Sequence, residues 1–334
     1  MAGGRSSEHD ISLASAQSVA EALDPERYEV QRIGIGRDGR WELPARSRPA
    51  LESGEAEGGL PLPRENGAAI EPLGGIDVVV PVLHGPFGED GTVQGLLELA
   101  DVAYVGPGVA ASAVCMDKDL FKAVMRANGI PVTRSLTVRR WERDEVTNPF
   151  GYPVVVKPAR LGSSVGISVA HDEAEFVRGV ELAFEHDEKV LVEEYVDGTE
   201  VECSVLGNER PIASLPGEIV PLVSEWYDYR AKYEEGGSDV IVPARIEPET
   251  AARVQELAVA AFVATECEGM ARVDFFVRRD GEVVVNELNT IPGFTSTSVY
   301  AKLFDASGIP YAELLDRLVQ LALERHARRA DLKY

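Results

Sequence analysis

The sequence contains 334 residues, 45% of them hydrophobic, which is enough to bury more than one core around a shared cleft. Its 33 Lys and Arg residues against 56 Asp and Glu give a formal net charge of −23, which would repel a nucleic-acid backbone and excludes general nucleic-acid binding. No apolar run reaches the roughly 18 residues of a membrane helix, and the three cysteines form no CxxC pair, so we expect a cytoplasmic protein without a membrane partner.

The first part of the chain predicts an open sheet with helices. Apolar residues at helical spacing predict a helix over Ser12–Leu23, and alternation predicts a strand over Tyr28–Ile35. Residues 37–75 have the composition of a long connection. The apolar run Asp77–Leu83 then predicts a buried parallel strand that ends in His-Gly-Pro-Phe-Gly, the kind of strand end at which ligands bind.

A GxGxxG pattern at Gly34, Gly36 and Gly39 invites a dinucleotide-binding interpretation. That interpretation requires a helix after the glycines, and Arg-Trp-Glu-Leu-Pro follows instead. We therefore predict a hairpin turn at Arg37–Arg40.

The middle and last parts predict a small α+β lobe followed by a larger one. The expected helices cover Thr92–Ala100, Asp117–Asn128, Asp172–His186, Pro248–Glu266 and Tyr311–Ala327. The expected strands cover Val132–Val138, Pro153–Lys157, Val165–Ala170, Lys189–Tyr195, Glu200–Leu206, Met270–Val277 and Val283–Glu287. A domain change is expected near Val105–Gly108.

The segment from Lys157 to Gly166 joins a lysine at a strand end to a Gly/Ser loop. Backbone N–H groups beside a fixed positive charge bind phosphate, although the lysine precedes the glycines and the pattern is not a P-loop. A Gly/Ser hairpin without a ligand is the plain alternative.

Paired polar residues lie near the carboxyl end. Arg272 and Asp274 are two apart in one expected strand, and Glu287 and Asn289 are two apart at the end of the next, so each pair lies on one face. If Arg279-Asp-Gly281 turns these strands into a hairpin, Asp274, Glu287 and Asn289 converge as oxygen ligands suited to Mg²⁺. The alternative is a solvated face with mixed charges.

Six segments together carry a specific resemblance. They are GGRSSEHDIS, HGPFGEDGTVQG, MDKDLFK, KPARLGSSVG, YDYRAKY and NELNTIPGFTSTS, in this order within residues 3–298. The chain resembles the D-alanine-D-alanine ligase family of the ATP-grasp superfamily. The resemblance implies a mixed α/β and α+β fold of three lobes: an N-terminal open parallel-sheet domain (1–106), a small ATP-grasp lobe (107–196) and a C-terminal lobe with a lid loop and a metal site (197–334).

The same resemblance implies the nucleotide and metal ligands. Lys118, Lys157, Ser164 and Lys232 would bind the phosphates of ATP, Glu193 the adenine amino group, Glu194, Tyr195 and Val196 the rest of the adenine slot, and Glu200 the ribose. Two Mg²⁺ or Mn²⁺ ions would be held by Asp274, Glu287 and Asn289.

It also implies the substrate contacts for two D-alanine molecules. Glu8 and His84 would lie near the ammonium of the first, Ser298 and the Val299 backbone would hold the carboxylate of the second, and Arg272 with the Gly293 N–H would form the oxyanion site. Tyr233 in the Tyr227–Tyr233 lid would hydrogen-bond with Ser163 and Glu8.

One departure from the family is expected. Its Gly-Gly motif follows a buried strand, yet only Met1 and Ala2 precede Gly3 here, so that strand is expected to be missing and its central place in the sheet to be empty. A start site assigned too late or a truncated chain would explain the loss.

Two other functions compete with dipeptide synthesis. In D-alanine-D-lactate ligases an alcohol replaces the second amine, and the lid differs around the tyrosine, so Tyr233 and Ser163 favour the dipeptide. A nucleotide-binding protein without catalysis would not require Arg272, Lys232 and three metal ligands. The family further implies a homodimer.

Overall fold

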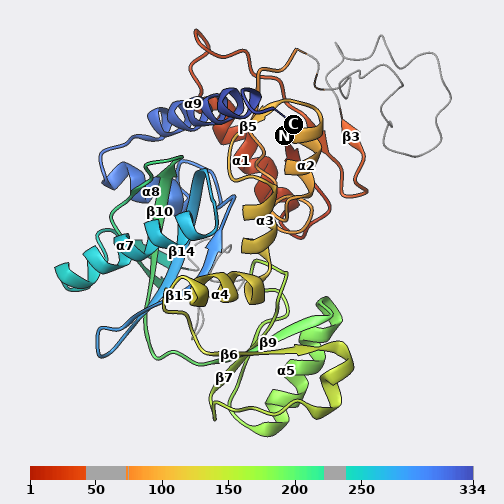
Figure 1. The fold of residues 1–334 in the computed structure, drawn as a ribbon, viewed down its shortest axis with the longest axis vertical. Coiled ribbons are helices and arrows are strands. Elements are labelled where there is room, and N and C mark those ends of the chain that lie inside the picture. The colour runs from red at the N-terminus through yellow and green to blue at the C-terminus, as the bar shows by residue number, and fades with distance from the viewer. Residues whose placement is uncertain (43–72, 74, 222–237, 334) are drawn as a thin grey trace, which may run out of the picture.

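The structure is a computed structural model that describes residues 1–42, 73, 75–221 and 238–333. Three groups of sheets and helices follow one another along the long axis of the molecule (Figure 1). The upper group contains residues 1–42 and 75–104 and the last helix, the lower group contains residues near 135–194, and a large antiparallel sheet lies between them.

Short strands build the N-terminal group. The elements are β1 (Ala2–Gly3), α1 (His9–Ala22), β2 (Gly34–Ile35), β3 (Trp41–Glu42), β4 (Val78–Val79), α2 (Thr92–Leu99) and β5 (Ala103–Tyr104). β1 pairs with β2 in parallel, β3 pairs with β2 antiparallel, and β4 pairs with β5 in parallel. The two predicted helices are confirmed, whereas the strands predicted over 28–35 and 77–83 are longer than the ones observed.

The expectation of an empty central strand position is wrong. The Met1 amino group donates to Val80 O (3.0 Å) and the Val82 N–H donates to Met1 O (3.0 Å), the pattern of neighbouring parallel strands. On the other side, Gly4 N–H donates to Ile35 O (2.7 Å). Residues 1–4 therefore lie between the segment of β2 and the segment that follows β4, and they hydrogen-bond to both. Three or four residues suffice to satisfy the buried backbone on both sides.

The hairpin predicted at Arg37–Arg40 is confirmed. Gly36 N–H donates to Arg40 O (2.8 Å), and Gly39, at φ 83°, donates to Gly36 O (2.8 Å). A positive φ of this kind is the conformation that glycine adopts without strain. Within 37–75, only residues 37–42, 73 and 75 belong to the described part of the chain.

The central lobe, named for its place in the sequence, is the lower group in Figure 1. It is a four-stranded antiparallel sheet covered by one helix. Its elements are β6 (Ser135–Arg139), the 3-10 helix η3 (Arg140–Glu145), β7 (Val154–Pro158), β8 (Ser168–Ala170), α5 (Glu173–His186) and β9 (Lys189–Glu194), with the strand order β6-β9-β7-β8. Before it come α3 (Val109–Met116) and α4 (Lys118–Ala127). Asp117 caps α4 by accepting from the N–H groups of Asp119 and Leu120 (both 3.2 Å), which fixes where the helix begins.

The largest sheet has the order β13-β12-β10-β14-β15, with β11 paired to β10. Its strands are β10 (Gly198–Gly207), β11 (Ile212–Ala213), β12 (Gly217–Pro221), β13 (Ser238–Ile241), β14 (Gly269–Arg278) and β15 (Val283–Asn289). α7 (Pro248–Ala264) and α4 bury one apolar cluster against it. A second cluster contains residues of α8 (Val299–Ala306) and α9 (Tyr311–Ala330).

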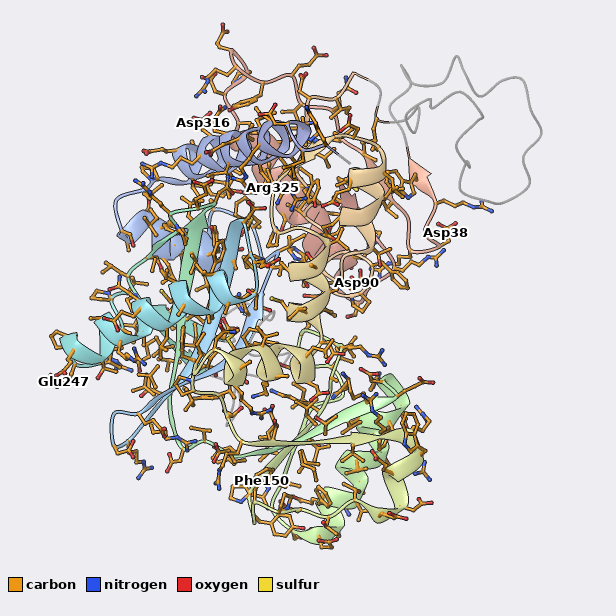
Figure 2. All side chains as sticks on the ribbon, viewed as in Figure 1. Asp38, Asp90, Phe150, Glu247, Asp316 and Arg325 are labelled. Carbon is orange, nitrogen blue, oxygen red and sulfur yellow. The ribbon has the colours of Figure 1, made fainter. Side chains whose placement is uncertain are left out.

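The helix α9 packs against the N-terminal elements. Its Leu315 and Leu318 share a buried cluster with Ala2 and Val19. Arg325, 3% exposed, donates to the carbonyls of Tyr104 (2.7 Å) and Gly106, and its guanidinium lies 4.3 Å from the Tyr104 ring centroid. Figure 2 labels Arg325 on α9, and Figure 1 shows β5 next to this helix. The last helix thus anchors residues 104–106, where the chain passes from the first lobe to the second.

Candidate functional site

The β14–β15 hairpin aligns the polar residues as predicted. Cα pairing sets Asp274 opposite Glu287 and Arg272 opposite Asn289, with an irregularity after Asp274. Asn289 Nδ2 donates to Asp274 Oδ2 (2.9 Å). The alternative of a solvated face is excluded for Asp274, which is 2% exposed.

Arg272 lies at the centre of the carboxylates. Its Nε and Nη2 donate to the two oxygens of Asp274 (2.7 and 2.8 Å), and Nε lies 2.8 Å from Glu202 Oε2 on β10. Glu202 is fully buried and faces Asp274 across the β10–β14 ladder. A buried carboxylate requires such a partner, so the guanidinium plane is fixed by two acids. The sequence did not single out Glu202.

Lys118 reaches the hairpin from the start of α4. Its Nζ lies 3.3 Å from Glu287 Oε2 and donates to Leu161 O (2.8 Å) in the Gly/Ser loop. The lysine is 6% exposed, so its charge is directed into the space between loop and hairpin.

A second charged cluster lies on β7, β9 and α4. Lys157 Nζ lies 2.7 Å from Glu193 Oε2 and donates to Asn286 Oδ1 (3.2 Å), while Lys122 Nζ lies 3.0 Å from Glu193 Oε1. Glu194 points the other way and pairs with Arg134 and Arg278 (2.8 and 2.6 Å). Neighbouring residues of a strand face opposite sides, which explains the different surroundings of the two glutamates.

The Gly/Ser loop has an unusual backbone. Ser163 and Ser164 have φ angles of 54° and 58°, in the left-handed region that serine seldom adopts. Successive N–H groups in such turns form anion-binding concavities. Glu8 Oε2 would lie 3.8 Å from a Cβ atom placed on Gly162 of this loop and 3.0 Å from one placed on Gly85. The Glu8 carboxylate therefore lies between the Gly/Ser loop and the loop that follows His84.

His84 is buried where the N-terminal and C-terminal lobes meet. Its Nδ1 lies 2.9 Å from Ile291 O, and its Nε2 lies 3.4 Å from Ser15 Oγ. A carbonyl only accepts, so Nδ1 carries the proton and donates to Ile291. Burial lowers the pKa of His84, opposed by the charge of Glu8, and this favours the neutral ring.

Glu89 is a residue that sequence reasoning missed. Its carboxylate accepts from Gly85 N–H (2.7 Å) and from Ile291 N–H (3.2 Å), so Glu89 holds the N–H, and His84 the carbonyl, of the same residue in the loop after β15. Burial, followed by the charge of Glu8, raises the pKa of Glu89 to about 8. The sequence signal that could have identified Glu89 is its position in the HGPFGED segment.

Replacing Glu89 by glutamine is expected to flatten the pH dependence of stability. The folded-state pKa of about 8 lies above the ordinary 4.5, so folding favours the protonated acid. This contribution is fully present below pH 4.5 and is lost as the pH rises through 8. We expect Glu89→Gln to reduce the loss of unfolding free energy across this range by roughly 1–4 kcal/mol in urea titrations. An unchanged dependence of the unfolding free energy on pH would contradict the raised pKa of Glu89. The control is Glu21→Gln, on the exposed side of α1.

The remaining predicted substrate contacts lie around the start of α8. Ser298 directly precedes the helix, its Oγ accepts from Thr295 N–H (3.0 Å), and it would lie 3.4 Å from a Cβ at Gly293. The Val299 N–H is in the first turn, where helices bind anions. Gly293, Ser298 and Val299 are therefore brought together.

Not every predicted residue joins these clusters. Lys232 and Tyr233, with the rest of the predicted lid, lie outside the described residues. Val196 is 8% exposed and Tyr195 is 41% exposed, directly after β9, and Glu200 is partly buried on β10.

Within the described residues, one surface hollow and the arrangement of the metal-binding side-chain types bear on where the site lies. A hollow of about 530 Å³ near Arg126, Arg134 and Phe150 contains none of the predicted site residues. No group of three or more His, Cys, Asp and Glu side chains is arranged to hold a metal. Two carboxylates and an amide are still a sufficient protein set for Mg²⁺, which takes its other ligands from substrate phosphates and water.

Known proteins resemble the chain over nearly all of its length. Family models described as D-ala D-ala ligase N-terminus and D-ala D-ala ligase C-terminus match residues 1–107 and 124–320. A D-alanine–D-alanine ligase A of Mesorhizobium japonicum is 48% identical, covering 98% of this chain and 97% of the relative, and that of Escherichia coli K12 is 44% identical, covering 99% and 96%.

Solved structures agree. The D-alanine-D-alanine ligase from Coxiella burnetii superposes with a TM-score of 0.82 at 38% identity, covering 98% of this chain and 94% of that one. VanG D-Ala:D-Ser ligase from Enterococcus faecalis gives the same score and identity, covering 96% and 97%. The three-lobed ATP-grasp fold expected from the sequence is confirmed, and the chain belongs to the D-alanine–D-alanine ligase family.

Proposed function

We propose that this chain is a D-alanine–D-alanine ligase that uses ATP to join two D-alanine molecules for peptidoglycan precursors. The observation that carries the proposal is the hairpin that sets Asp274 opposite Glu287, beside Arg272 and within reach of Lys118. Curated relatives of that name, 44–48% identical over nearly the full length, support it. We divide the chain into functional lobes at 1–106, 107–196 and 197–334.

Nucleotide binding is assigned to the central lobe and the sheet beside it. Lys118 and Lys157 would hold phosphates with Ser164, and Lys232 would close over them from the lid. Glu193 would accept from the adenine amino group, the backbone of residues 194–196 would line the base, and Glu200 would bind the ribose. The left-handed turn at Ser163 and Ser164 supports the phosphate assignment because it gathers N–H donors.

The hairpin would hold the divalent ions. Asp274, Glu287 and Asn289 supply oxygen atoms on one face, the donor type that Mg²⁺ and Mn²⁺ prefer. When bound, such ions supply charge stabilisation at the transferring phosphoryl group. Fluorescence or calorimetric titration with Mn²⁺ in the presence of ADP would measure this site directly.

The substrates would lie between the N-terminal lobe and the hairpin. Glu8 and His84 would receive the ammonium of the first D-alanine, and Ser298 with the Val299 N–H the carboxylate of the second. Arg272 and the Gly293 N–H would stabilise the oxyanion, and Tyr233 would close the site with Ser163 and Glu8. The fixed guanidinium of Arg272 supports this role, because donors that are already oriented stabilise developing charge most effectively.

A carboxylate requires activation before an amine can displace its oxygen. Transfer of the γ-phosphoryl group to the first D-alanine gives an acyl phosphate, with Arg272 and Lys232 balancing the charge. The amine of the second D-alanine then attacks the carbonyl, Arg272 and Gly293 hold the oxyanion, and collapse releases phosphate and the dipeptide. Closure of the lid would keep water from the acyl phosphate.

Product analysis tests the proposal. ATP with D-alanine is expected to give ADP, phosphate and a dipeptide, identified by mass, whereas L-alanine gives none. D-lactate and D-serine are offered beside D-alanine as competing second substrates, and a predominant depsipeptide or mixed dipeptide would redefine the specificity. Absence of phosphate release with every substrate would favour a non-catalytic nucleotide-binding protein.

Location and assembly are also proposed. No helix in the described residues is long and apolar enough to cross a membrane, and the three cysteines are free and buried. The free and buried cysteines support a cytoplasmic enzyme. The homodimer stays a prediction that light scattering coupled to size-exclusion chromatography would test.

A further inference from the structure

Lys122 is a fully buried lysine in the second turn of α4, outside the proposed contacts to nucleotide and substrate. Its Nζ lies 3.0 Å from Glu193 Oε1, contacts the Thr133 hydroxyl and lies 3.4 Å from Thr133 O. Burial lowers the pKa of Lys122 to about 8. Burying an ammonium group costs free energy, which an opposite charge and hydrogen bonds at close range must offset.

Glu193 lies between two lysines. Its Oε1 faces Lys122, and its Oε2 faces Lys157 at 2.7 Å. Burial alone would raise the pKa of Glu193, but the two cations together hold it below its ordinary value. The carboxylate is therefore ionised and can only accept hydrogen bonds.

The two lysines differ in what else they can reach. Lys157 also donates to Asn286 Oδ1 on β15, and it is a proposed phosphate ligand, so a bound phosphate would compete with Glu193 for its charge. Lys122 has no exposed side-chain surface, and its remaining contacts are to Thr133. With ATP bound, Lys122 would therefore remain as a counter-ion of Glu193.

We infer that Lys122 is a specificity-determining residue that selects adenine by keeping Glu193 an oriented, ionised acceptor. This inference rests on the proposed adenine contact of Glu193. Adenine presents an amino group at position 6, which donates to a carboxylate. Hypoxanthine and guanine present a carbonyl oxygen there, which an ionised carboxylate repels and a protonated one would bind.

The test compares ATP with ITP in a Lys122→Met variant, which keeps the volume of the side chain. We expect the ratio of kcat/KM for ATP over ITP to fall by about tenfold or more, chiefly through a higher KM for ATP, with kcat within about threefold. Raising the pH from 6.5 to 8.5 should restore part of the ATP preference in this variant, since it ionises Glu193 again. Affinities for ADP and IDP, measured by calorimetry, should change in parallel.

A matched control removes another buried lysine of the same lobe. Lys189 is 5% exposed, and its Nζ lies 2.6 and 2.5 Å from the two oxygens of Asp117. Lys189→Met should lower the Tm and leave the ATP over ITP ratio unchanged. If Lys122→Met does not fold, Thr133→Val removes one hydrogen-bond partner of Lys122 and should shift the ratio in the same direction by about two- to fivefold.

The Glu193→Gln variant distinguishes a failure of the Lys122 inference from a failure of the proposed adenine contact. If this variant loses ATP preference while Lys122→Met and Thr133→Val keep it, the role of Lys122 is overturned and the proposed function stands. If Glu193→Gln keeps the preference, the adenine assignment itself is overturned. Loss of preference in both single variants, with no further loss in the double variant, is the expected result.

Discussion

Replacing Arg272 by methionine is expected to lower kcat by about 10²- to 10³-fold. The guanidinium is fixed by both oxygens of Asp274 and by Glu202, so it is already oriented for the developing oxyanion. Methionine preserves volume and removes the charge. Single-turnover measurement of acyl transfer at saturating ATP and D-alanine gives the rate.

Stability requires a separate measurement in the same variant. Removing Arg272 leaves Asp274 and the fully buried Glu202 without their cation, which we expect to lower the unfolding free energy by about 3 kcal/mol or more. Rates are therefore compared well below the Tm of the variant. Arg272→Lys is the control, because it restores charge without the planar fork and should recover stability better than rate. A kcat within threefold of the unchanged protein in Arg272→Met would refute the oxyanion role.

Replacing Glu287 by glutamine is expected to abolish turnover of ATP at ordinary Mg²⁺ concentrations and to weaken Mn²⁺ binding by at least about tenfold. The change keeps the shape of the side chain and removes one of two carboxylates on the metal face. Lys118 also loses its partner at 3.3 Å, so its charge is no longer balanced when phosphates are absent. Metal titrations and D-alanine-dependent phosphate release provide the two readouts.

The hairpin contains its own control. Glu282 lies near the turn, is more than half exposed, and pairs with Arg278 at 2.8 Å. Glu282→Gln should leave metal affinity and turnover unchanged, because a surface ion pair contributes little. Phosphate release that persists in Glu287→Gln with an unchanged Mg²⁺ dependence would remove this residue from the metal site.

The hairpin and its ligands were predictable because their signals are local. Residues 270–277 and 283–287 were predicted as strands, Arg279-Asp-Gly281 as the turn between them, and a spacing of two placed each polar pair on one face. The Gly/Ser loop was predictable for the same reason, although the left-handed conformation of Ser163 and Ser164 was not.

The residues that sequence reasoning missed act between elements distant in the chain. Glu89 matters because Ile291 reaches it from two hundred residues away, and Glu202 because β10 lies beside β14. Lys122 lies one helical turn after Lys118, so its orientation was readable, but its burial against Glu193 was not. The short strand at Ala2–Gly3 escaped prediction because neighbouring backbone, rather than its own side chains, holds it.

The packing of α9 has a consequence for how the enzyme is made. Ala2, Val19 and Val82 are buried together with Leu314, Leu315 and Leu318, which the ribosome adds long after them. The N-terminal lobe therefore lacks part of its interior until residues 314–318 have been synthesised. During that interval its apolar surface faces the cell, and a chain interrupted before residue 311 would retain that exposure permanently.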